Sequence, residues 1–398
     1  MHAFPDRPKN WPSAAALRLD AVADHGWSLL ADFATPICSL AESALAANLT
    51  EVAGWCKGLG VELAPHGKTT MSPELITQQL EHGAWAITAA TPWQAERMID
   101  WGVPRVILAN ICVDPRPLAA LLAREAEVWT FVDSPESVRH TAAAVPAGRR
   151  LPVLIEVGSP GGRCGVRTVP QGLTLAGAIA DEPRLELVGV AAFEGTVTGR
   201  TADTIAVVRE HIDTVRRLAR ALVDLHAFPT DRPVVLSAGG SMYPDLVVAG
   251  LRAEAGIGQE ATIVLRSGCS LVHDHGLYAE SARGPRLRPA MRVWSRVLSV
   301  PEPGWAIIDA GKRDLTVDPP ARVLSVRRHP DDPPRTVELV LDHHNDQHGY
   351  IRFTDEDLRV GDLLELGISH PCLTFDRWTH IPLVDDDLTV VGAVRTCF

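Results

Sequence analysis

The chain has 398 residues, of which 46% are hydrophobic and 22% charged, a composition typical of a globular protein long enough for two domains. Its formal net charge of −11 argues against nucleic acid and against anionic membrane surfaces as partners. No apolar run approaches the ~20 residues of a membrane span, and the first residues lack the apolar segment of a signal peptide. Because the seven cysteines are odd in number and lack pairing spacings, we expect a reducing, cytoplasmic setting.

The first 280 residues predict alternating helices and strands. A polar lead with one helix around residues 14–23 comes first, followed by a short strand at 35–40 and a helix at 41–58. Eight apolar runs follow, most of them separated by helical stretches: 61–64, 84–88, 106–109, 128–132, 153–157, 187–193, 234–237 and 262–265. This alternation predicts an α/β fold of the size of a (β/α)8 barrel. A doubly wound open sheet has the same alternation, although no glycine-rich dinucleotide fingerprint follows the first strand.

The last part of the chain predicts a smaller all-β domain. Its short runs are rich in β-branched residues and separated by Pro, Gly and Asp: 292–300, 305–308, 336–341, 349–353, 363–366 and 388–394. Residues 322–334 are basic and then rich in Pro and Asp, so we expect an exposed loop there. The predicted domains are therefore a barrel at 31–280 and a β domain at 281–398, with residues 1–30 packed on the latter.

Lys68 is the first candidate for chemistry. The apolar run before Pro65 predicts a strand, and Ser72-Pro73-Glu74 predicts a helix start with Ser as the N-cap. Lys68 is thus expected at the carboxyl end of a strand, the edge where α/β folds bind ligands. A lysine there can be an imine-forming nucleophile, or simply a solvated loop lysine.

Two glycine turns follow the seventh and eighth predicted strands. Ser237-Ala238-Gly239-Gly240-Ser241 offers backbone N–H groups and a hydroxyl to an anion, and Arg266-Ser267-Gly268-Cys269-Ser270 offers a second such turn. In (β/α)8 enzymes these two loops often bind phosphate, so their joint placement favours a phosphate site over two ordinary turns.

Three further residues are candidates. Arg163 follows the fifth predicted strand, where it could face a phenolate or carboxylate oxygen or tie down a long loop. In the β domain, His370 and Cys372 lie two positions apart, so that an imidazole and a thiolate could share one metal ion, zinc above all. Two ligands leave the other positions to water or substrate. We interpret His343 and His344 as part of a polar hairpin.

Seven motifs together resemble one enzyme family. They are Pro65-His66-Gly67-Lys68-Thr69, Gly161-Gly162-Arg163-Cys164-Gly165, Phe193-Glu194-Gly195-Thr196, Ser237-Ala238-Gly239-Gly240-Ser241, Leu265-Arg266-Ser267-Gly268-Cys269, Asp346-Gln347-His348 and His370-Pro371-Cys372. Their order resembles the pyridoxal-phosphate enzymes of the alanine-racemase-like fold, in the branch of D-serine dehydratase, D-threonine aldolase and the amino acid deaminases. The similarity runs from about residue 35 to the C-terminus. Phe193 stands where a tyrosine is expected, and Ser270 where related chains carry an aromatic residue.

The resemblance implies a role for each matching residue. Lys68 would form the imine with pyridoxal 5'-phosphate, and Arg163 would lie beside the cofactor. The phosphate would be held by Gly239, Gly240 and Ser241 together with Gly268 and Cys269. His370 and Cys372 would bind a divalent metal, with zinc preferred over manganese or magnesium, as in the dehydratase members; His348 would be a possible neighbour of that metal. The family also implies a homodimer.

The resemblance implies a lyase that acts on a small D-amino acid. The expected reaction is dehydration and deamination of a β-hydroxy D-amino acid of the D-serine or D-threonine type, giving a ketoacid and ammonia. Retro-aldol cleavage to glycine and an aldehyde is the alternative, because the same site could remove the β-hydroxyl proton instead. A third possibility is a non-catalytic pyridoxal-phosphate-binding protein, but the related small proteins of that kind lack a β domain.

Overall fold

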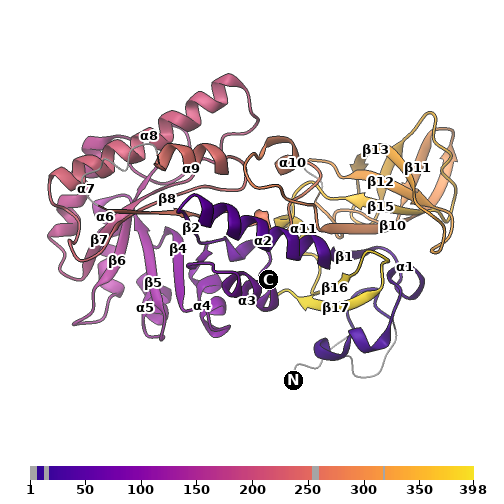
Figure 1. The fold of residues 1–398 in the computed structure, drawn as a ribbon, viewed down its shortest axis with the longest axis horizontal. Helices are drawn as coiled ribbons and strands as arrows, with labels where there is room; N and C mark the ends of the chain where they lie inside the picture. Colours follow the sequence, from indigo (N-terminus) through magenta and orange to yellow (C-terminus); the bar gives the residue numbers. More distant parts are fainter. Residues whose placement is uncertain (1–6, 13–17, 253–259, 317–318) are drawn as a thin grey trace.

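The computed structural model describes residues 7–12, 18–252, 260–316 and 319–398, which form two sheet-based units (Figure 1). The first unit is an eight-stranded parallel sheet in the order β2-β9-β8-β7-β6-β5-β4-β3. Its strands are β2 (Glu62–Leu63), β3 (Ile87–Ala89), β4 (Arg105–Ile111), β5 (Glu127–Val132), β6 (Leu151–Val157), β7 (Leu185–Ala192), β8 (Val234–Ala238) and β9 (Ala261–Leu265).

Backbone hydrogen bonds close this sheet into a barrel. The N–H of Trp85 donates to the carbonyl of Leu63 at 2.7 Å, and that of Thr88 donates to the carbonyl of Pro65 at 2.9 Å. These bonds join the end of β2 and the residues just after it to the chain before and within β3, the two ends of the strand order. The predicted (β/α)8 barrel and its eight apolar runs are therefore confirmed.

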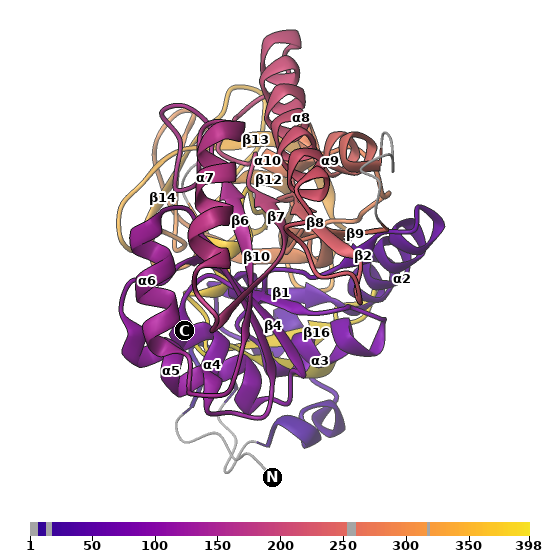
Figure 2. The same ribbon diagram turned by 90° about the vertical axis from the view of Figure 1, so that its left-hand side faces the viewer.

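Helices surround the barrel, as Figure 2 shows from the barrel side. They are α2 (Glu42–Gly58), α3 (Pro73–Glu81), α4 (Pro92–Asp100), α5 (Pro115–Leu122), α6 (Pro135–Ala144), α7 (Val169–Ala180), α8 (Ala202–Asp224), α9 (Pro244–Arg252) and α10 (Leu277–Ser281). Helices α3 to α6 each begin with proline after a Ser, Thr or Asp whose side chain accepts a backbone N–H of the first turn. These caps fix where each strand-to-helix turn ends. Apolar side chains fill the barrel interior and the space between strands and helices.

The second unit is a mostly antiparallel β domain. Strands β10 (Met291–Glu302), β11 (Trp305–Ile308), β14 (Gly349–Arg352), β13 (Arg335–His344), β12 (Arg322–Arg327) and β15 (Leu363–Gly367) pair in that order, and β15 pairs with β10 to close the ring. On the open flank of β10 the sheet continues through β1 (Ile37–Ala41), β16 (His380–Val384) and β17 (Val390–Arg395). The smaller all-β domain is therefore confirmed.

One predicted loop is wrong. Residues 322–327 form β12, which pairs with β13 on one side and β15 on the other. Val323 and Val326 are buried in the domain core, while arginines at both ends of the strand gave the sequence its loop-like, basic character. Strand β16 was not predicted at all.

The N-terminal segment packs on the β domain. Trp11, Leu29 and Phe33 belong to the same apolar core as the β-domain strands. The helix expected at residues 14–23 falls in part on residues outside the described ranges; the described part has two short 3-10 turns, Leu19–Ala21 and Ala23–His25, and then α1 (Leu29–Asp32). Residues 37–41 lie within the predicted barrel domain, but β1 pairs with β10 and β16 of the β domain. Within the described ranges, none of the helices has the length and apolar character needed to cross a membrane.

A buried asparagine on α2 ties the helix to the segment that links the two units. The Asn48 amide donates to the carbonyls of Leu271 and Arg288 at 2.8 and 2.7 Å, and its oxygen accepts the N–H of Arg288 at 2.7 Å. The side chain is completely buried. All three bonds fix residues 271–288 against α2.

We expect Asn48→Ala to lower the free energy of unfolding by about 2–4 kcal/mol, because it leaves buried backbone groups without partners. Thr50→Ala, on the exposed face of the same helix, removes only a bond to the Ala46 carbonyl and should stay within about 0.5 kcal/mol of the wild type. Denaturant titration of both variants checks this. Equal losses in the two variants would contradict the assigned role of Asn48.

Candidate active site

A cavity of about 240 Å³ lies where the carboxyl ends of the barrel strands face the β domain. Eight of the nine predicted site residues line it: Lys68, Arg163, Gly240, Ser241, Gly268, Cys269, His370 and Cys372. The ninth, Gly239, is buried behind the lining. Residues more than 300 positions apart in the chain thus meet at one place, and they come from both units.

Lys68 lies in a single 3-10 turn, Gly67–Thr69, between β2 and α3. Ser72 caps α3 by accepting the N–H of Leu75, so the predicted helix start after this turn is confirmed. The turn packs directly on the loop after β9. A Cβ at Gly268 would stand 2.6 Å from both the carbonyl oxygen of His66 and Oγ1 of Thr69, so only glycine allows this approach.

The glycine turn after β8 holds an internal carboxylate. The N–H groups of Gly239 and Gly240 donate to the two oxygens of Glu194 at 3.0 and 2.9 Å. Glu194 is buried just beyond β7; burial raises the pKa of its carboxyl, and the N–H of Gly240 acts in the opposite direction. The two amides expected to face a phosphate therefore bind Glu194. A phosphate at this turn depends on Ser241 and on the loop after β9.

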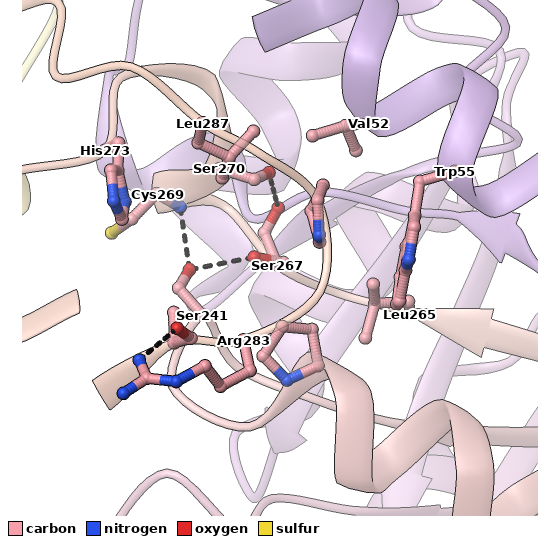
Figure 3. Close-up of a pocket in the computed structure, with 13 residues that line it drawn as sticks. Val52, Trp55, Ser241, Leu265, Ser267, Cys269, Ser270, His273, Arg283 and Leu287 are labelled. Carbon is pink, nitrogen blue, oxygen red and sulfur yellow. Dashed lines mark hydrogen bonds between the residues drawn. The ribbon is translucent and has the colours of Figure 1, made fainter. Parts of the chain in front are cut away.

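Ser241 joins the two glycine loops (Figure 3). Its Oγ accepts the N–H of Cys269 at 3.0 Å and the hydroxyl of Ser267 at 2.9 Å. Ser270 donates to the carbonyl of Ser267 at 2.9 Å. A second cavity, of about 50 Å³, lies beside these residues against Trp55 of α2. The small side chain of Ser270 lines this space.

Cationic side chains dominate the main cavity. Arg163 places its guanidinium 4.3 Å from the ring centroid of Phe193, a cation–π contact, and the buried Arg266 donates to the carbonyl of Ala192. Burial lowers the pKa of Arg266 to about 10, with Glu156 and Glu194 opposing the shift, so it stays charged at neutral pH. Together with Lys68 these residues favour an anionic ligand.

Unpaired polar atoms on the wall also point to a ligand. Nδ1 of His66 and Nε of Arg266 are buried and have no hydrogen-bond partner among the described residues. Buried polar atoms are seldom left unpaired, so a polar group in the cavity would complete them. Burial, and then the charges of Lys68 and Arg266, lower the pKa of His66 well below its ordinary value. The amine, the guanidinium groups and the serine-linked loops fit a phosphorylated carbonyl cofactor such as pyridoxal phosphate.

A cluster of side chains that could bind a soft metal ion forms one end of the cavity. Cys372 begins α11 (Cys372–Phe375), and its Sγ lies 3.4 Å from Sγ of Cys269 and 3.5 Å from Oγ1 of Thr69. One ligand atom each from Cys269, His370 and Cys372 lies within 4.8 Å of the others. His370 and Cys372 were predicted as metal ligands, whereas Cys269 was expected only beside the phosphate.

The electrostatics of the cluster favour a thiolate at Cys372. The hydrogen bond with Cys269, and then contact with His370, hold the pKa of Cys372 well below its ordinary value. Burial disfavours the cation of His370, but the bond to Cys372 and its charge raise the pKa of this imidazole. Among the described residues, His348 belongs to the turn between β13 and β14 and is not a member of the cluster.

Several wall residues were not singled out from the sequence. Thr69, Arg266 and Tyr278 line the cavity, and the ring of Tyr278 packs edge-on against His370 at 5.9 Å. Glu194 and Arg266 belong to motifs that carry the family resemblance. The sequence therefore indicated that they lie near the site, but not what they do there. Tyr278, in contrast, has no local pattern that distinguishes it.

Comparison with known proteins identifies the class. Residues 40–243, just over half of the chain, match the family model described as "Alanine racemase, N-terminal domain", and residues 290–384 match one described as "Putative serine dehydratase domain". The chain therefore belongs to the alanine racemase N-terminal domain family, the fold type III pyridoxal-phosphate enzymes.

Particular relatives extend the match over most of the chain. A D-threonine aldolase from Arthrobacter sp. is 28% identical over 369 residues, 90% of either protein. The crystal structure of D-threonine aldolase from Filomicrobium marinum superposes with a TM-score of 0.78 at 25% identity, covering 93% of this chain and 97% of that one. D-threo-3-hydroxyaspartate dehydratase from Delftia sp. HT23 has the same fold, with a TM-score of 0.74 at 22% identity and coverage of 93% and 99%.

We expect Glu194→Ala to destabilise the protein by about 2–4 kcal/mol, since it leaves two buried amides unsatisfied. The amides of Gly239 and Gly240 should also exchange with deuterium faster than in the wild type. Glu136→Ala on the exposed start of α6 is the control and should change neither quantity appreciably. Unchanged protection of the two glycine amides in Glu194→Ala would contradict their hydrogen bonding to the Glu194 carboxylate.

Proposed function

We propose that the protein catalyses the pyridoxal-phosphate-dependent dehydration of a β-hydroxy D-amino acid to a ketoacid and ammonia. The observation that carries the proposal is the shared cavity: the amine of Lys68 and the His370–Cys372 pair line the same space of about 240 Å³. One end can bind an amino acid through a carbonyl cofactor, and the other can hold a metal near the β-hydroxyl. The D-configuration rests on the relatives, whose names specify D-amino acid substrates.

Residues for both groups are present. Lys68 would hold pyridoxal phosphate covalently, with its phosphate near Ser241, Gly268 and the backbone of Cys269, and Arg163 beside its ring substituents. His370 and Cys372 would hold a divalent metal, of which zinc best suits an imidazole and a thiolate. When bound, pyridoxal phosphate supplies an electron sink for charge at the substrate Cα, and the metal supplies a Lewis acid for the hydroxyl.

Individual residues of the chain would then have separate roles in the reaction. The Lys68 amine, once released from the cofactor, stands ready to accept the α-proton of the substrate. Arg163 offers a guanidinium to an anionic oxygen of cofactor or substrate. Thr69, adjacent to Lys68 and 3.5 Å from the sulfur of Cys372, connects the proton-accepting end of the cavity with the metal end. Loss of hydroxide from Cβ and hydrolysis of the resulting enamine yield ketoacid and ammonia.

Retro-aldol cleavage is a second candidate, favoured by the relatives named D-threonine aldolase. Removal of the β-hydroxyl proton, rather than loss of the hydroxyl, would break the Cα–Cβ bond and give glycine and an aldehyde. The His-x-Cys pair favours dehydration, because it resembles the metal-binding pair of the dehydratase members. A non-catalytic cofactor-binding protein fits less well, since the β domain contributes the candidate metal ligands His370 and Cys372 to the cavity.

A product assay tests the reaction. With D-threonine, we expect the holoenzyme to release ammonia and 2-oxobutyrate in equal amounts, and with D-serine ammonia and pyruvate. L-serine and L-threonine are the matched controls and should give neither product. Glycine and acetaldehyde from D-threonine would show aldol cleavage and contradict the proposed dehydration. The absence of product from all four amino acids would refute catalysis on these substrates.

A lysine variant tests the cofactor site. Wild-type protein should absorb in the range of ~410–430 nm typical of bound pyridoxal phosphate, and borohydride should fix one pyridoxyl group to it. Lys68→Ala should lose the fixed group and all turnover, whereas Lys57→Ala on the outside of α2 should retain both. Mass spectrometry of reduced peptides measures the link. Equal fixation in Lys68→Ala would show that another lysine holds the cofactor.

A further inference from the structure

We propose that Cys269 is a third protein ligand of the metal, so that the site is a Cys2His zinc centre with one open coordination position. This goes beyond the His-x-Cys pair that the sequence motif supplies. It rests on the proposed function only for its catalytic consequence, since the ligand set can be measured without turnover.

The spacing of the sulfur atoms supports a shared ion. Two Zn–S bonds of about 2.3 Å at a tetrahedral angle place their sulfurs about 3.8 Å apart. The observed Sγ–Sγ distance of 3.4 Å between Cys269 and Cys372 is close to this value, and far from the about 2.05 Å of a disulfide. The imidazole of His370 completes a triangle of ligand atoms within 4.8 Å of one another.

Separate elements hold the ligands in place before any metal binds. Cys269 opens the 3-10 turn after β9, where its N–H donates to Ser241. Cys372 opens α11 in the other unit, and Thr374 of that helix accepts the N–H of Thr316 at 3.2 Å. An ion at this point would therefore bridge the barrel and the β domain.

The surroundings of Cys269 also argue against a simple packing role. A buried cysteine usually behaves as a small apolar side chain. Sγ of Cys269 instead contacts Sγ of Cys372 and lies 4.0 Å from Oγ1 of Thr69. Three groups able to bind or orient a ligand thus converge on one point of the cavity wall.

A Cys2His set has definite chemical consequences. Two thiolates and a neutral imidazole compensate the charge of Zn²⁺, and binding releases the protons that these ligands still carry. Soft sulfur ligands select zinc over magnesium and manganese, which prefer oxygen. Three protein ligands with a fourth position free for water or substrate is the pattern of a catalytic rather than a structural zinc site.

X-ray absorption at the zinc edge of the holoenzyme tests the proposal by counting sulfur neighbours. We expect two sulfurs per zinc at about 2.3 Å in the wild type, and one in either Cys269→Ser or Cys372→Ser. Competition with a chromophoric chelator should show zinc bound about 100-fold or more weakly by Cys269→Ser. Manganese should fail to displace zinc from the wild type at equal concentration.

Cys112→Ser is the control, because Cys112 is a buried cysteine outside the cavity whose thiol donates to the Asp114 carbonyl, a bond serine can keep. It should retain two sulfurs per zinc. One sulfur per zinc in the wild type, or an unchanged count in Cys269→Ser, would overturn the proposal. So would a Cys269–Cys372 disulfide in zinc-free protein, shown by a mass 2 Da lower than expected and by a peptide that links these two cysteines. Ketoacid formation together with a single sulfur would refute the third ligand and leave the proposed function intact.

Discussion

The close approach of two backbone turns determines the geometry of this site. The turn that carries Lys68 lies against the loop after β9 at Gly268, where no side chain fits between the two backbone segments. This approach places Thr69 beside Cys269, and the packing of α11 against the same turn adds Cys372. The lysine end and the sulfur end of the cavity are consequently rigid with respect to each other. A substrate bound between them would meet both without a large movement of either unit.

Negative charge behind the cavity wall offsets part of the positive charge that faces the cavity. Lys68, Arg163 and Arg266 face the cavity, while the carboxylate of Glu194 lies behind the glycine turn after β8. Glu194 therefore orders that turn and offsets part of the positive charge, without itself competing for the ligand. Neutral His66, whose pKa burial lowers, adds polar atoms to the wall and no further charge. The result is a cavity whose positive charge attracts an anion.

Sequence reasoning predicted the regular part of this fold for a clear reason. The barrel strands are buried on both faces, so they read as continuous apolar runs, and Ser, Thr or Asp before proline fixes several helix starts. Strand β12 was missed because arginine and serine interrupt its valines. The strand β1 was predicted, but its place in the β domain and the pair Cys269–Cys372 depend on contacts between distant parts of the chain, which no local pattern reveals. The two glycine amides illustrate the same limit, since their partner Glu194 lies 45 positions upstream of Gly239.

The expected homodimer stays a prediction.

Protonation states around the candidate metal ligands bear on the choice between dehydration and cleavage. Loss of the β-hydroxyl needs a proton donor near the departing oxygen, whereas cleavage needs a base for the hydroxyl proton. Burial, and then the neighbouring Cys269 and Cys372, raise the pKa of Tyr278, whose ring edge meets His370. Its phenol therefore stays protonated at neutral pH and can donate. The hydroxyl of Thr69 has the same character, and burial makes His66 a weak base. Tyr278 and Thr69 thus offer protons at this end of the cavity, which the proposed dehydration would require.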